Sequence, residues 1–227
     1  MMEKNSYQVE NNLIFFRRAK KEDNIEEIAK LIYDTDPYIY PYWFENDENK
    51  CVEFIKKHYH NEGFIFNYNN LYVAYDTTID KIVGLICAID KSVNLEYDYE
   101  SILKINTHYE KTIKKYIKAV LDEVKEFDET TISIPNVCID KHLRGKNIGT
   151  KLLGYFISQM EKAGYEKFAL DCLLHNLQAK NLYHGLGFRE MKLISGFSGD
   201  DTKIEVVSFL RKKGAYLPEE FSNYNGL

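Results

Sequence analysis

The sequence has few cysteines, prolines and glycines: 4, 4 and 12 in 227 residues. The cysteines, at positions 51, 87, 138 and 172, lie far apart, which predicts buried reduced thiols rather than disulfides or a metal site. The shortage of proline and glycine, with no low-complexity stretch, excludes a long disordered linker. Apolar runs such as residues 82–89 are only strand-sized, so we expect no membrane-spanning helix and no membrane partner.

The first residues, MMEKNSYQVENN, lack the apolar segment of an export signal, so we expect a cytoplasmic protein. What the chain does have is apolar bulk, with 44% hydrophobic and 14% aromatic residues. This is enough for one substantial core, and we expect residues 1–227 to form a single domain.

The net charge of −5 disfavours a nucleic-acid partner, because such proteins need a basic surface. The charge is uneven along the chain. Residues 140–192 contain nine Lys or Arg and five Asp or Glu, a net of +4, which leaves the remainder at −9. A locally basic segment in an acidic protein indicates a bound anion, although scattered solvated charges are the alternative.

Hydrophobic periodicity predicts strands and helices without regular alternation. Strands are expected at 12–19, 71–76, 81–90, 129–140, 168–174 and 203–210, and helices at 22–33, 50–60, 148–160 and 176–185. Residues 71–90 are expected to form a hairpin, and Pro135 to mark a bulge or an edge because it cannot donate to a ladder. The mixture favours one α/β (α+β) domain with a mixed, mostly antiparallel sheet.

A segment of about residues 101–127 differs from the rest. Its apolar residues recur every three or four positions with no glycine or proline, which predicts one long amphipathic helix or two with a short bend. We expect it to be a helical insertion between the hairpin and the next strand.

The stretch HLRGKNIGTKLL, residues 142–153, combines basic residues and glycines between a strand and a helix. A helix N-terminus has unpaired N–H groups and partial positive charge, so it attracts phosphates. Arg144 and Lys146 would add charge, and Gly145 and Gly149 would let the backbone approach a ligand. The spacing fits neither a P-loop nor G-x-G-x-x-G. Alone, the stretch is equally consistent with an ordinary helix start carrying two surface cations.

A second motif follows in LDCLLHNLQAKNLYHGLGF, residues 170–188. Together the two segments resemble the GNAT superfamily of acyl-CoA-dependent N-acyltransferases, whose loop reads Arg/Gln-x-x-Gly-x-Gly/Ala and whose later element reads Asn-x-x-Ala-x-x-x-Tyr before Gly-Phe. The matching residues are Arg144, Gly149, Asn176, Ala179, Tyr183, Gly187 and Phe188. One position departs: Asn147 stands where the family usually has its first glycine, and Asn tolerates the left-handed backbone better than most residues.

The resemblance implies a central mixed, mostly antiparallel twisted sheet flanked by helices, with strands splayed apart at the acyl-CoA site. It implies acetyl-CoA as co-substrate and no metal. The pantetheine is expected to pair with the backbone of Val137 and Ile139, like an added strand. The remaining cofactor-binding residues expected are Arg144, Gly145, Lys146, Asn147, Ile148, Gly149, Thr150 and Asn176.

The chemistry implied is direct attack of a primary amine, on a small molecule or a peptide, on the thioester. Tyr183 would be the general acid that protonates the departing thiolate, with simple core packing as the alternative for this side chain. No acid lies between Thr130 and Ile139, where several relatives carry a Glu. Asp171, His175 or a base acting through water are the candidates, and each side chain has an ordinary structural alternative.

The acceptor side of this fold usually includes the segment after the first helix, which here combines acids and aromatics over residues 34–48. This suits a cationic amine, and a solvated acidic loop is the alternative. A homodimer is left open. The alternative function is a CoA-binding regulatory module without efficient turnover, since the strand carboxylate is missing and Asn147 replaces a glycine. A purely structural interaction protein would leave both motifs as coincidence.

Overall fold

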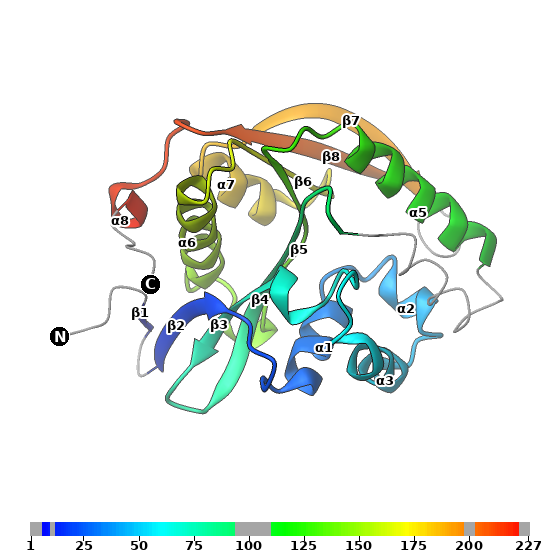
Figure 1. Ribbon diagram of the computed structural model, residues 1–227, viewed down its shortest axis with the longest axis horizontal. Coiled ribbons are helices and arrows are strands. Elements are labelled where there is room, and N and C mark those ends of the chain that lie inside the picture. The colour runs from blue at the N-terminus through cyan, green and yellow to red at the C-terminus, as the bar shows by residue number, and fades with distance from the viewer. Residues whose placement is uncertain (1–5, 10–11, 94–109, 198–202, 223–227) are drawn as a thin grey trace.

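A single eight-stranded sheet organises the chain, with the order β1-β2-β3-β4-β5-β6-β8-β7 (Figure 1). The structure is a computed structural model that describes residues 6–9, 12–93, 110–197 and 203–222. The strands are β1 Ser6–Val9, β2 Asn12–Arg18, β3 Leu71–Asp76, β4 Lys81–Ile89, β5 Thr131–Ile139, β6 Lys167–Leu173, β7 Arg189–Phe197 and β8 Lys203–Lys212.

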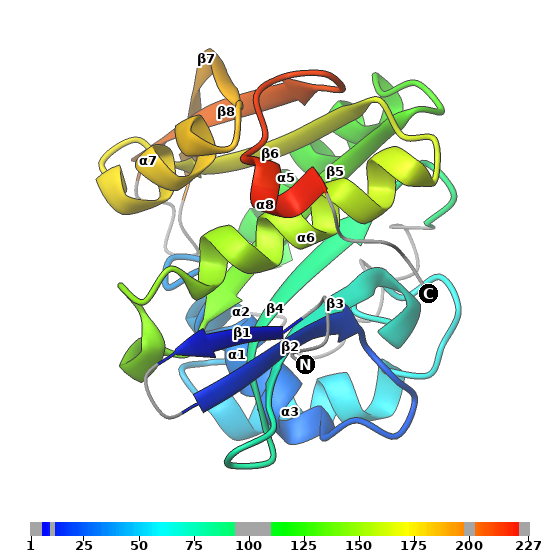
Figure 2. The same cartoon turned by 90° about the vertical axis from the view of Figure 1, so that its left-hand side faces the viewer.

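Helices cover both faces of the sheet. They are α1 Ile25–Tyr33, α2 Tyr40–Trp43, α3 Glu48–His58, α5 Glu110–Lys125, α6 Ile148–Lys162, α7 Leu177–Gly185 and α8 Glu219–Ser222, with short 3₁₀ turns at Tyr68–Asn70 and Lys141–Leu143. In Figure 2, α6 crosses the near face of the sheet with α8 beside it, and α1 and α3 lie behind β1 and β2.

Two apolar cores lie on opposite faces of the sheet, as the alternation of strand side chains requires. One core joins α1, α2 and α3 to residues such as Leu85 and Cys87 of β4. The other joins α6 and α7 to Val83 and Ile86 of the same strand. The middle strands therefore bury both faces, and their near-continuous apolar sequence follows from this position.

All neighbouring strands are antiparallel except β5 and β6. This agrees with the mixed, mostly antiparallel sheet expected from the sequence. The β3–β4 hairpin is also present as predicted, and Gly164 follows the last turn of α6 with φ +102°, in the conformation that commonly ends a helix.

The predicted helical insertion is described only in part. α5 accounts for residues 110–125 and lies against β7, beside the outer strands in Figure 1. Residues 101–109 of the prediction lie outside the described residues.

The segment after α1, expected to be a loop, contains the one-turn helix α2. Pro41 lies in its first turn, where a missing N–H removes no helical hydrogen bond. Tyr40 and Trp43, three residues apart, are both buried, with ring centroids 5.5 Å apart in an edge-to-face arrangement. Burial of this aromatic pair accounts for the helix, which local sequence alone does not indicate.

Gly187, in the Gly-Phe pair after α7, cannot carry a side chain without rearrangement. Its φ is +83°, and an added Cβ would lie 2.5 Å from the carbonyl oxygen of Tyr216. We expect Gly187→Ala to lower the free energy of unfolding by about 1–3 kcal/mol, measured by urea denaturation. Gly185→Ala is the matched control, because a Cβ there meets nothing within 4 Å. Equal stability of the two variants would contradict this account.

Candidate active site

The strands β5 and β6 separate soon after they begin. They pair in parallel only from Thr131 to Ser133 on β5 and from Lys167 to Ala169 on β6. Beyond this point each strand continues without the other, and a cavity of about 680 Å³ lies at the separated ends. Strand ends that diverge beside a helix start are a common place for ligands in mixed sheets.

The cavity wall comes from five parts of the chain: the segment after α1, the end of β5, the loop into α6, the end of β6 and the start of α7. The lining residues are Asp34, Thr35, Pro37, Val137, Cys138, Ile139, Leu143, Arg144, Gly145, Asn147, Ile148, Gly149, Thr150, Leu173, Asn176, Gln178, Ala179 and Leu182. Nine of the residues expected to bind the cofactor are in this set, and Lys146 is not.

The end of β5 directs alternate backbone groups to its open edge. The N–H of Asp140 donates to the carbonyl of Val83 on β4 at 2.8 Å, so this residue faces the paired edge. Backbone groups of successive residues in a strand point to opposite edges, which turns those of Val137 and Ile139 toward the cavity. The carbonyl of Ile139 accepts a 2.9 Å hydrogen bond from Nε of Arg144, which holds this guanidinium beside the strand end.

The N-terminus of α6 forms a second part of the wall. Gly145 and Asn147 both have left-handed backbones, with φ of +77° and +64°. The departure from the family glycine is therefore accommodated, because Asn adopts this conformation more readily than other side chains. The first N–H groups of a helix have no acceptor one turn earlier, and Ile148, Gly149 and Thr150 carry these groups at the cavity. The arrangement favours an anion.

Gly149 serves close packing rather than backbone freedom. An added Cβ would lie 3.3 Å from Cδ1 of Leu182 on α7 and 3.5 Å from Cγ1 of Ile139 on β5. The absence of a side chain therefore lets the first turn of α6 approach both neighbours and narrow the cavity.

Asn176 is the N-cap of α7, where its side chain accepts a hydrogen bond from the N–H of Ala179 at 3.1 Å. This explains the Asn-x-x-Ala spacing of the motif in structural terms. Both residues also line the cavity, as does the neighbouring Gln178. The sequence pattern did not identify Gln178 as a site residue, nor Leu143, Leu173 or Cys138.

Tyr183 is buried, with 7% of its surface exposed, and is not among the lining residues. Its ring packs against Phe188 and Phe209, at centroid distances of 5.9 and 5.4 Å. Burial raises the pKa of its hydroxyl well above the usual value, and the nearby Cys172 and Asp171 add to this shift. The side chain keeps its proton at neutral pH, and Leu182 next to it reaches the cavity wall.

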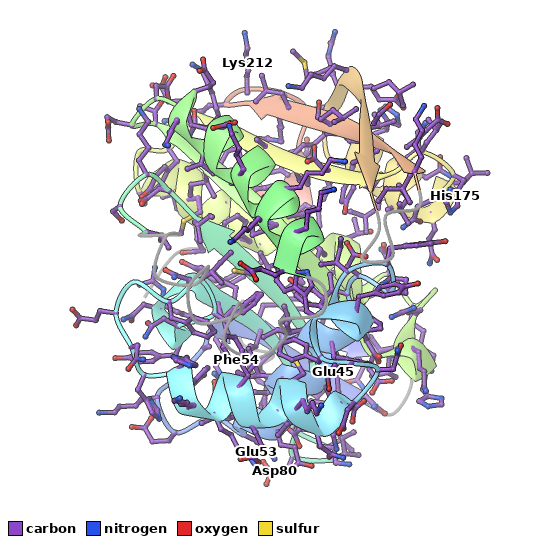
Figure 3. All side chains as sticks on the ribbon, turned by 90° about the vertical axis from the view of Figure 1, so that its right-hand side faces the viewer. Glu45, Glu53, Phe54, Asp80, His175 and Lys212 are labelled. Atoms are coloured by element: carbon purple, nitrogen blue, oxygen red, sulfur yellow. The ribbon has the colours of Figure 1, made fainter. Side chains whose placement is uncertain are left out.

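The two side chains considered as bases lie elsewhere. Asp171 on β6 is exposed and does not line the cavity, although Leu173 two residues later does. His175 is also exposed, and Figure 3 shows it at the outer edge of the molecule. The structure brings neither of them into the cavity wall.

The acids after α1 have different roles. Asp34 lines the cavity with Thr35 and Pro37. Asp36 accepts a 2.8 Å hydrogen bond from the N–H of Tyr38, and burial raises the pKa of its carboxyl. Asp47 caps α3 by accepting from Asn49 N–H at 2.9 Å. Only one of these three carboxylates therefore faces the cavity.

Within the described ranges, no group of three or more His, Cys, Asp or Glu side chains could hold a metal ion. In the same part of the chain, no helix combines the length and apolar character needed to cross a membrane.

A mixed sheet whose central strands separate, with a helix N-terminus at the opening, is the arrangement that the resemblance to acyl-CoA-dependent transferases implied. The chain belongs to the acetyltransferase (GNAT) family, whose profile matches residues 25–188. It is therefore an acyltransferase enzyme of a family that uses acetyl-CoA. A comparison with curated protein sequences gives no match.

Solved structures share this fold at low sequence identity. An N-acetyltransferase from Staphylococcus aureus Mu50 is 22% identical, with a TM-score of 0.59 and coverage of 86% of this chain and 99% of that one. An agmatine N-acetyltransferase in its apo form is 16% identical, with a TM-score of 0.60 and coverage of 88% and 99%. The NatC complex bound to Gag peptide and CoA contains a chain 16% identical, with a TM-score of 0.53 and coverage of 88% and 98%.

The left-handed backbone at Asn147 generates a prediction. Alanine should be strained in this conformation, and Asn147→Ala should lower the free energy of unfolding by about 1 kcal/mol. Asn147→Gly should keep the wild-type value, because the side chain makes no capping hydrogen bond. The midpoints of urea denaturation, compared at an unchanged m-value, measure the stability of both variants. If the glycine variant lost as much as the alanine variant, the side chain rather than the backbone would be responsible.

Proposed function

We propose that the protein transfers an acetyl group from acetyl-CoA to a primary amine by direct attack. The observation that supports this best is the shared cavity: the open edge of β5 and the N-terminus of α6 line the same space. One presents hydrogen-bonding groups to an extended chain, and the other presents N–H groups to an anion. CoA has both features, a pantetheine arm and a pyrophosphate.

In this proposal the pyrophosphate binds the N–H groups at residues 144–150, assisted by Arg144 and Lys146. The pantetheine pairs with Val137 and Ile139 as an added strand in the space that β6 leaves open. The thioester oxygen is polarised at the same strand as charge develops on it. Asn176, at the start of α7, is proposed to contact the bound CoA as well.

Tyr183 is proposed as the general acid. Tyr183 does not line the cavity, so this role requires its hydroxyl to reach the thiolate past Leu182, which does line it. Collapse of the tetrahedral intermediate breaks the C–S bond, and the thiolate takes a proton from the phenol. A Tyr hydroxyl has an ordinary pKa near ~10 and a thiol near ~8.5, so the transfer depends on close geometry. Burial raises the pKa of Tyr183 further, which keeps the phenol protonated over the working range and also makes it a weaker acid toward the thiolate. Asp171 and His175 are exposed and lie outside the wall, so the amine proton is proposed to leave to water, and water returns a proton to the Tyr183 phenolate after each turnover.

The acceptor is proposed to have two basic groups, one that stays cationic and one amine that attacks in its neutral form. Asp34 is a lining residue of the cavity and brings a carboxylate to its wall. A second cationic group on the substrate would pair with this carboxylate while the neutral amine attacks.

Tyr183→Phe tests the general acid. We expect kcat to fall about 10²-fold, because general acid catalysis contributes at least that much, while the CoA Kd stays within about twofold. Thiol release from acetyl-CoA measures kcat, and calorimetry measures CoA binding. The wild-type kcat should show no alkaline decline from this group up to about pH 9.5, because its pKa lies above the ordinary value. Wild-type kcat in the variant would remove Tyr183 from the mechanism.

The acceptor class is tested with a panel of agmatine, polyamines, aminoglycosides, amino acids and peptide N-termini. We expect turnover with polycationic amines, and Asp34→Asn to raise their KM about tenfold, equivalent to about 1.4 kcal/mol. Glu53→Gln is the matched control, since it removes the same charge from an exposed position on α3 (Figure 3). A screen that returns only neutral or acidic amines would contradict the cationic acceptor.

A further inference from the structure

The residue Asn136 lies at a bulge that redirects the side chains of β5. Between Cys87 and Ile89 on β4 the ladder advances two residues, while on β5 it advances three, from Asn136 to Ser133. The extra residue on β5 changes which face the following side chains occupy. Before the bulge, even-numbered residues such as Ile134 join the core under α6.

After the bulge, the same parity faces the other side of the sheet. Cys138 belongs to the core of α1 and α3, and Val137 packs against the core under α6. Asn136 has the parity of Cys138, and its side chain reaches Tyr40 at the start of α2. The bulge therefore turns a polar side chain toward the segment expected to receive the acceptor.

The amide of Asn136 is only half satisfied. The residue is 3% exposed, and Nδ2 donates to the hydroxyl of Tyr40 at 3.0 Å. Among the residues that the structure describes, its Oδ1 is the one buried side-chain nitrogen or oxygen without a hydrogen-bond partner. Leaving a buried acceptor unpaired costs about 1–3 kcal/mol, so its persistence calls for an explanation.

Neighbours of Asn136 and Tyr40 line the cavity, while the two residues themselves do not. Val137, the next residue of β5, lines the cavity, and so does Pro37, three residues before Tyr40. The two segments also meet at Thr35 and Cys138, both in the wall. The hydrogen bond between Asn136 and Tyr40 is a further contact between β5 and the segment after α1. It lies just outside the wall, at the β5 bulge and next to the proposed thioester site.

We propose that Oδ1 of Asn136 accepts a hydrogen bond from an N–H of the acceptor amine and positions the nitrogen for attack. This rests on the proposed acetyl transfer. Tyr40 is a positioning residue, because its hydroxyl accepts the hydrogen bond from Nδ2 that holds the amide in place. The amide carbonyl is uncharged, so it orients a neutral amine without stabilising the ammonium form as a carboxylate would. The same strand has no acid between Thr130 and Ile139.

The test is a set of variants assayed with acetyl-CoA and the best amine of the panel. Asn136→Leu keeps the branching and the number of side-chain heavy atoms and removes the acceptor, and we expect the amine KM to rise about tenfold with the CoA Kd within twofold. Asn136→Asp restores an acceptor oxygen and should recover at least half of this loss on a logarithmic scale. Tyr40→Phe should raise the amine KM about threefold, because the amide loses the partner that orients it.

Thr131→Val is the matched control. It removes a buried hydroxyl on the same strand that donates to Asp128 at 2.8 Å, at the end of β5 away from the cavity. We expect it to lower stability and leave the amine KM unchanged. If Asn136→Leu and Thr131→Val changed KM alike, or if Asn136→Leu left KM unchanged, the inference would be overturned. Failure of the proposed function itself would appear separately, as a wild-type protein that binds CoA but releases no thiol with any amine.

Discussion

The short pairing of β5 with β6 is the constraint on which the rest of the site depends. A bulge next to Pro135, which has no N–H to donate, bends β5 away while β6 remains fully paired with β8. The two strands share only three residue pairs, and their open edges form opposite walls of a cavity. Had they continued side by side, backbone groups at Val137 and Ile139 would be used by the sheet rather than available to a ligand.

The separation of β5 and β6 also brings charged groups of both signs to the cavity wall. The first turn of α6 and Arg144 bring N–H groups and a cation to the wall, and Asp34 brings a carboxylate. Apolar side chains such as Leu173 and Leu182 lie in the wall as well. The wall therefore contains groups suited to an anion and a group suited to a cation, which the proposed acetyl-CoA and cationic amine together require.

Particular residues show which parts of the site could be predicted from the sequence. The loop and the Asn-x-x-Ala-x-x-x-Tyr motif predicted the family, and the expected cofactor-binding residues make up half of the cavity wall, because both motifs are local patterns whose helix starts and glycines act over a few residues. The same motifs did not separate Asn176, which caps a helix and lines the cavity, from Tyr183, whose ring is buried against Phe209. Local spacing places a residue on an element, but contact with a cavity depends on elements far apart in sequence.

The sequence by itself determined most of the longer strands and helices, the polar start of α6 and the left-handed tolerance at Asn147, since these follow from periodicity and backbone preference, but it missed β1, α2 and α8. Only the tertiary structure decided that Asp171 and His175 stay outside the cavity and that Asp34 enters it. It also decided that Asn136 is buried with an unpaired oxygen beside Tyr40, 96 residues away in the chain. For Asn136 the physical reason is the β5 bulge, because its effect on side-chain direction depends on the register with β4. This is a long-range pairing that no local pattern encodes.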